Sequence, residues 1–212
     1  MLKNPDLSRM DERDVFLREL THRTANTLQR VIAALHFARR GNSLLLETAT
    51  RQVGGAARVH ALLAGGDSGI VDTALFFKEL CEALEQGWLS GSKILIEKDF
   101  PSLFMTVADA RRVAMIVFEL ISNAIEHAFP ERAGRVAIAV RDDTKQTHIL
   151  IEDDGVCYGW SRPDGQGAGI VDALVGILNG KIARSITAGG SLRVNLTFPS
   201  FNILVHDVAG AS

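Results

Sequence analysis

Three residues near the N-terminus have the types and spacing for phosphorus chemistry. His22, Asn26 and Gln29 fall on one face of a helix expected from Asp11 to about Arg39. An exposed imidazole is a nucleophile, and an amide one turn away could orient a water molecule or a phosphoryl oxygen. A lone histidine on a polar helix face is more often simply solvated, so this pattern depends on support from the rest of the chain.

Two acidic patterns lie in the second half of the chain. Glu119, Asn123 and His127 recur at intervals of four on one helix face, and a carboxylate and an amide one turn apart suit Mg²⁺. A polar face with internal hydrogen bonds is the alternative. The segment Ile149–Gly155 is an apolar strand that ends in acids, where Asp153 could accept a hydrogen bond from an exocyclic amine such as that of adenine. An ordinary acidic turn is the alternative there.

A glycine-rich turn precedes a further helical pattern. Gly165, Gly167 and Gly169 would let backbone N–H groups approach phosphate at the start of that helix. Their spacing is neither GxGxxG nor GxxxxGK[ST], which excludes a dinucleotide fingerprint and a P-loop. A glycine-rich turn by itself is a weak signal.

Composition limits the classes of protein to consider. The chain has 212 residues, of which 47% are hydrophobic and 23% charged, and its net charge is −2. This balance predicts a globular protein with no electrostatic attraction to nucleic acid. Two cysteines make no disulfide framework and favour a reducing cytoplasm. There is no signal-peptide pattern, and no apolar run approaches the ~20 residues of a membrane span.

The elements that must position these residues fall into two groups. Apolar spacing predicts a first helix from Asp11 to about Arg39 and a second from Ser43 to Leu63, joined as a hairpin. One hairpin cannot bury both apolar stripes, so we expect a homodimer with a four-helix bundle. Glycines at 65–69 form a linker, which predicts domains 1–66 and 67–212.

The second domain is expected to be an α/β sandwich with a mostly antiparallel sheet, giving an α+β chain. Helices are expected at 72–89, 107–128 and 168–178, and strands at 93–98, 135–141, 146–152, 181–185 and 191–198. In the tail, an apolar stretch at 203–205 could form an edge strand or pack on a neighbour.

Taken together and in order, these motifs resemble a bacterial sensor histidine kinase core, a phospho-acceptor hairpin followed by a Bergerat-type ATPase domain. The sequence His22-Arg23-Thr24-Ala25-Asn26-Thr27-Leu28-Gln29 looks like the subfamily motif His-Arg-x-x-Asn-x-Leu-Gln. The stretch 119–129 is similar to the asparagine box. Asp153-Asp154-Gly155 and Gly167-Ala168-Gly169 resemble the two glycine boxes, and the resemblance extends over about residues 12–199.

The resemblance implies a role for each matching residue. His22 would accept the phosphoryl group of ATP, helped by Arg23 and Asn26, and would pass it to an aspartate on the receiver domain of a response regulator. Asn123 would hold Mg²⁺, beside Glu119 and His127. Asp153 and Gly155 would receive the adenine, and Ser191 replaces a threonine near it. The phosphates would meet the glycines, Gly165, Gly167 and Gly169.

Three departures keep other functions open. Cys157 stands where a glycine is usual, Glu126 stands where a lysine is common, and the lid at 158–164 is short. The main alternative is an ATP-independent histidine phosphotransferase or response-regulator phosphatase with a degenerate ATPase domain. A partner-switching serine kinase or anti-sigma factor on the same fold is a third possibility, although it does not need the His22 hairpin.

For the histidine kinase core that the resemblance implies, an upstream sensor protein would supply the signal.

Overall fold

The chain is described by a computed structural model that covers Ile32 and residues 43–64, 68–89, 92–129, 132–156 and 166–203. Ile32 is helical, but the remainder of the helix expected over 11–39 lies outside the described residues. The expected domain boundary at residues 66 and 67 lies outside them as well.

The larger sheet has five strands, and their bounds agree with the predicted strands to within one or two residues. These strands are β2 (Ile94–Asp99), β4 (Gly134–Asp142), β5 (Gln146–Asp153), β6 (Lys181–Ile186) and β7 (Leu192–Pro199). Their order is β2-β4-β5-β7-β6, and only β2 and β4 run parallel. The expectation of a mixed, mostly antiparallel sheet is therefore confirmed.

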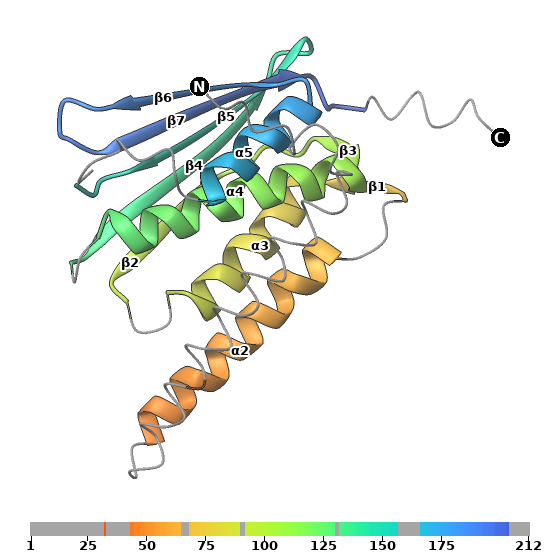
Figure 1. Cartoon of the computed structure of the whole chain (residues 1–212). Helices are drawn as coiled ribbons and strands as arrows, with labels where there is room; N and C mark the ends of the chain where they lie inside the picture. Colours follow the sequence, from red (N-terminus) through yellow and green to blue (C-terminus); the bar gives the residue numbers. More distant parts are fainter. Residues whose placement is uncertain are drawn as a thin grey trace, which may run out of the picture.

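Helices cover one face of this sheet in successive layers, as Figure 1 shows. They are α2 (Ser43–Ala64), α3 (Thr73–Gly87), α4 (Val107–His127) and α5 (Gln166–Ile177). Helices α4 and α5 lie next to the sheet, α3 lies against α4, and α2 packs on α3 farthest from the strands. Alternate residues of β4, Val136, Ile138 and Val140, point into the same continuous core.

A small second sheet was not predicted, because its strands are too short to show a pattern. It pairs β1 (Ile70–Asp72) with β3 (Phe104–Thr106) in antiparallel fashion. Each strand ends in the N-cap of a helix: Asp72 accepts from the N–H of Ala74 at 2.8 Å, and Thr106 accepts from the N–H of Asp109 at 3.1 Å. This sheet therefore fixes where α3 and α4 begin.

Helix α2 packs closely on α3. A Cβ added at Gly55 would lie 2.4 Å from the Cα of Gly87, so only glycine permits this approach. Val59 and Leu63, farther along α2, are buried in the same core as the sheet. Gly55 is therefore the point at which the two helices meet.

The start of the tail is held along β3. Ser200 donates to the carboxylate of Asp142 at 2.8 Å, and the N–H of Ile203 donates to the carbonyl oxygen of Phe104 at 2.7 Å. The ring of Phe201 packs on Phe198, with 5.3 Å between ring centroids. Residues 200–203 therefore connect the β4–β5 turn to the small sheet. The rest of the predicted apolar stretch lies outside the described residues.

Candidate functional site

The carboxylate of Asp153 is buried at the end of β5, with 5% of the residue exposed. It accepts a hydrogen bond from the N–H of Gly155 at 2.9 Å and another from the N–H of Leu192. Burial raises the pKa of the Asp153 carboxyl, the two backbone hydrogen bonds oppose the shift, and the neighbouring charges of Asp154 and Glu152 add to it. A buried acceptor in this position suits a ligand that brings its own hydrogen-bond donor.

Ser191 lies beside Asp153, because it precedes the residue whose N–H binds that carboxylate. Its hydroxyl is 2.6 Å from the hydroxyl of Thr187, and 8% of the residue is exposed. Gly190 has a φ of 85°, a left-handed conformation that glycine adopts without strain and that closes the turn before β7. The structure therefore brings together Asp153, the last residue of β5, and Ser191, which directly precedes the neighbouring strand β7.

Gly155 joins this pair to the end of α4. A Cβ at Gly155 would lie 2.4 Å from both the Cβ and the carbonyl oxygen of Ala128. The next residue, Val156, donates its N–H to the same oxygen at 3.1 Å. The sequence resemblance assigned Gly155 to the approach of a base. The structure adds a packing reason for glycine at this position.

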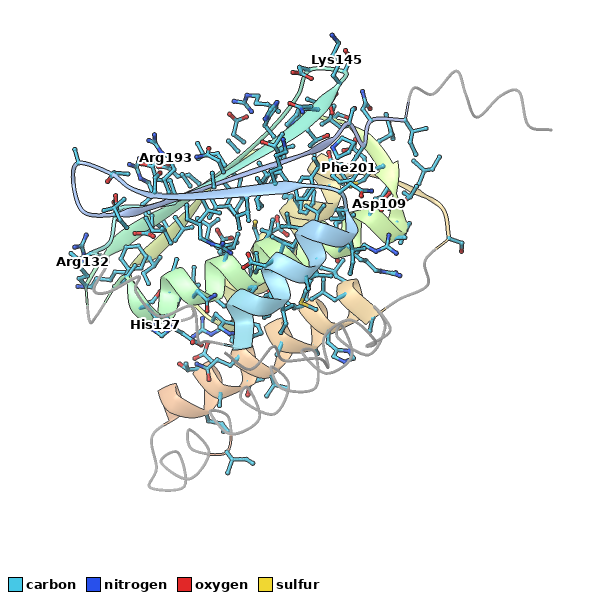
Figure 2. The ribbon with its side chains drawn as sticks, turned by 45° about the horizontal axis from the view of Figure 1, so that its top comes forward. Asp109, His127, Arg132, Lys145, Arg193 and Phe201 are labelled. Carbon is cyan, nitrogen blue, oxygen red and sulfur yellow. The ribbon has the colours of Figure 1, made fainter. Side chains whose placement is uncertain are left out.

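The last two turns of α4 carry the predicted cation ligands. Asn123 donates its amide N–H to Oε1 of Glu119 at 3.2 Å, which leaves the amide oxygen as the group able to face a cation. Exposure increases along the face: Glu119 is fully buried, Asn123 is half-buried and His127 is exposed. Figure 2 shows His127 at one end of α4, with Asp109 at the other.

Helix α5 begins earlier than predicted. It starts at Gln166, so Gly167 and Gly169 lie in its first turn and not in a preceding loop. The N–H groups of the N-cap and of the first three helical residues lack intrahelical acceptors, and that of Gly167 is among them. A Cβ at Gly169 would meet no atom within 4 Å, so its surroundings are open. N–H groups at this helix start could donate hydrogen bonds to a phosphate oxygen.

Several predicted site residues fall outside the described part of the chain. They are His22, Arg23, Asn26 and Gly165. The same holds for Cys157 and for the lid at 158–164. Glu126, the acid that replaces a common lysine, is exposed on α4. Within the described ranges, no three His, Cys, Asp or Glu side chains cluster as a metal site.

Two residues of this region carried no assigned role in the sequence interpretation. Asp154 is part of the acidic turn and of the first glycine-box motif, with no role of its own, and Arg132 follows a helix without a recognisable pattern. In the structure Arg132 donates to the carbonyl oxygen of Asp154 at 2.7 Å. The only sequence indication was the doubled acid after the strand.

Solved structures define the class of fold. The histidine kinase domain of a blue-light-activated histidine kinase from Erythrobacter litoralis aligns over 89% of this chain and 94% of its own length, with a TM-score of 0.55 and 20% identity. A bacterial phosphotransferase aligns over 92% of this chain and 98% of its own, with a TM-score of 0.61 and 12% identity. The chain therefore has the α+β fold of histidine kinase catalytic domains. A comparison with protein-family models finds no match.

Curated relatives show the same likeness at the level of sequence. The sensor histidine kinase PdtaS of Mycobacterium tuberculosis is 31% identical over 77% of this chain and 35% of its own length. Blue-light-activated histidine kinase 2 of Erythrobacter litoralis is 25% identical over 93% of this chain and 60% of its own length. These relatives support a histidine kinase core in this chain and confirm the family resemblance. The chain spans about a third of the length of the mycobacterial relative.

In the portion of the chain that the structure describes, no helix combines the length and apolarity needed to cross a bilayer.

Proposed function

We propose that this chain is the core of a two-component histidine kinase, which binds Mg·ATP, phosphorylates its own His22 and transfers the phosphoryl group to an aspartate on the receiver domain of a response regulator. The observation that carries the proposal is the buried Asp153 carboxylate beside Ser191, at the end of the helix that bears Asn123. It is the arrangement that an adenine amine requires, and the similarity to histidine kinases supports it.

The polar groups of the site fit Mg·ATP, the proposed substrate. Asp153 would accept from the exocyclic amine of adenine, and the first N–H groups of α5 would bind phosphate oxygens. Asn123 would ligate Mg²⁺, whose remaining ligands would be phosphate oxygens and water, so a single protein oxygen is enough. The bound ion would neutralise phosphate charge, and the protein would contribute mainly by positioning the substrate.

The proposed reaction exchanges one bond for another. An imidazole nitrogen of His22 would attack the γ-phosphorus while the bond to the bridging oxygen breaks, and ADP would leave with that electron pair. Arg23 would hold phosphoryl oxygens through charge-assisted hydrogen bonds. Asn26, one turn along, would orient a phosphoryl oxygen. We also propose a homodimer through the hairpin of domain 1–66, a cytoplasmic location and an upstream sensor protein as its partner.

Labelling with γ-labelled ATP tests this function. We expect acid-labile incorporation into the purified chain that is lost in His22→Ala, because the acceptor is gone, and in Asn123→Ala, because the metal ligand is gone. Incorporation at full level in His22→Ala contradicts the assignment of the acceptor. Acid-stable label would instead indicate a serine kinase on the same fold.

The second candidate is a histidine phosphotransferase or response-regulator phosphatase that does not use ATP. Glu126 favours it, since this acid stands where a lysine is common and a carboxylate close to the phosphates would repel them. A bacterial phosphotransferase has a similar fold, so the likeness in fold favours neither of the two functions. Titration with Mg·ATP does separate them, because a ligand that binds the folded state raises the melting temperature. A shift supports the kinase, and its absence supports the second candidate.

A further inference from the structure

The chain leaves the β4–β5 ladder at Asp154 in an unusual way. The N–H of Asp154 donates to the carbonyl oxygen of Arg135 at 3.0 Å, as an antiparallel ladder requires. The return bond comes from the side chain: the N–H of Arg135 donates to Oδ1 of Asp154 at 2.7 Å. The Asp154 carboxylate therefore takes the place of a backbone carbonyl, and the main chain is free to turn away toward Gly155.

Arg132 binds the backbone carbonyl that this exchange releases. Its Nη2 donates to the carbonyl oxygen of Asp154 at 2.7 Å, and its guanidinium carbon lies 5.8 Å from the centre of the Phe129 ring. Phe129 is buried just beyond α4, so its ring gives the Arg132 guanidinium a fixed surface to pack against. Figure 2 shows Arg132 at the same end of the molecule as His127.

These hydrogen bonds also fix the backbone next to Asp153. The peptide that follows it is held by Arg135 and Arg132 on one side, and Val156 is held by Ala128 on the other. Between these points the N–H of Gly155 turns back to the Asp153 carboxylate. The direction of that carboxylate is therefore set by groups outside it.

We propose that Asp154 and Arg132 are positioning residues, which hold the turn 153–156 so that the Asp153 carboxylate faces the adenine amine. The nucleotide part of this proposal rests on the proposed function. The role of Asp154 is that of a hydrogen-bond acceptor and not of a charge. Its side chain is 46% exposed, so its ion pair with Arg135 at 4.0 Å is screened by solvent.

Amide hydrogen exchange of the nucleotide-free protein tests the positioning itself. In Asp154→Ala we expect the amides of Gly155 and Val156 to exchange about tenfold faster, because the turn loses an anchor. Asp154→Asn keeps the acceptor oxygen and should exchange as the wild type does. Arg132→Ala should act in the same direction as Asp154→Ala. Unchanged exchange in Asp154→Ala, or equal acceleration in Asp154→Asn, overturns the proposal.

Matched controls come from the other end of the same strand pair. Asp143 accepts backbone N–H bonds from Lys145 and Gln146 at 3.0 and 2.7 Å, and Arg141 donates to the carbonyl oxygen of Val140 at 2.7 Å. Asp143→Ala and Arg141→Ala remove bonds of the same kind far from the turn 153–156. They should leave the exchange of Gly155 and Val156 unchanged, and acceleration there in either control would show a global effect and overturn the proposal.

Calorimetric titration with Mg·ATP tests the consequence for binding. We expect Asp154→Ala and Arg132→Ala to weaken the affinity about tenfold, with Asp154→Asn and both controls near the wild type. Wild-type affinity in Asp154→Ala overturns the nucleotide part of the proposal. If the wild-type chain itself does not bind Mg·ATP, both the proposed function and the nucleotide part of this proposal are wrong. The exchange rates still decide whether Asp154 and Arg132 hold the turn.

Discussion

At the scale of single residues, Asp153 links stability to the proposed binding role. Its pKa is raised mainly by burial, so the folded protein holds this proton more tightly than the unfolded chain does. The stability gained from the proton is fully present below the ordinary value of 3.8 and is lost as pH rises through the raised pKa. Above the raised pKa, the charge of the buried Asp153 carboxylate lowers the free energy of unfolding.

Asp153→Asn should therefore raise the melting temperature at pH 7, because the amide oxygen can still accept from Gly155 while the buried charge is removed. The gain should shrink as pH falls through the raised pKa and vanish below about pH 3.8. Affinity for Mg·ATP should fall about tenfold or more, since an acceptor with charge is replaced. Thermal melts over a pH series and a titration measure both effects.

Asp72 provides the contrasting control. A hydrogen bond from Ser102 holds the pKa of the Asp72 carboxyl below its usual value, so its charge stabilises the fold at neutral pH. Asp72→Asn should lower the melting temperature at pH 7, with the difference disappearing on acidification. A melting temperature of Asp153→Asn below that of the wild type at pH 7 would contradict this account of Asp153.

Residue types and spacing were enough to single out much of the site. The acid at the end of an apolar strand correctly indicated that Asp153 closes β5, and the resemblance drawn from the motif order agrees with the similarity to histidine kinases. Arg132 could not be found in this way, because its partner is a backbone oxygen 22 residues away, and backbone groups carry no sequence signature. The packing role of Gly155 depends on the end of a distant helix and was equally hidden.

At the scale of elements, the contact between α2 and α3 depends on one of two adjacent glycines. Gly55→Leu should lower the free energy of unfolding by about 1–3 kcal/mol, because backbone atoms of α3 occupy the space of the new side chain. Gly54→Ala, one residue earlier, meets no atom within 4 Å and should raise it by up to about 1 kcal/mol through helix propensity. Urea unfolding measures both, and equal effects would contradict the packing account.

Helical periodicity predicted α2, α3 and α4 almost to the residue, since their apolar faces are long. It did not reveal which neighbour each face meets. On α2, the apolar residues Leu46 and Val53 are 49% and 43% exposed, whereas Val59 and Leu63 are buried. Which element a helix face packs against depends on contacts between residues far apart in the sequence. The short strands β1 and β3 likewise form only by pairing with each other across such a distance.

At the scale of the whole molecule, residues 200–203 hold the two sheets together. Phe201→Ala should lower the free energy of unfolding by about 1–3 kcal/mol, because the ring is partly buried against Phe198. Figure 2 shows Phe201 at the end of the molecule opposite Arg132, so affinity for Mg·ATP should not change. Leu75→Ala, which truncates a residue that is 70% exposed, is the control and should be nearly neutral. Urea unfolding and titration report the two quantities, and a stability loss as small as that of the control would contradict the anchoring role.

The strand order also has a consequence for synthesis. β7 follows the other strands of the larger sheet in the chain, yet it is inserted between β5 and β6. A nascent chain that has not yet reached Pro199 therefore leaves the whole length of β5 as an open edge, with backbone donors and acceptors able to pair with another chain. The ribosome must release the final strand before the sheet can close, so premature stops in this region should yield aggregating fragments and not partly active ones.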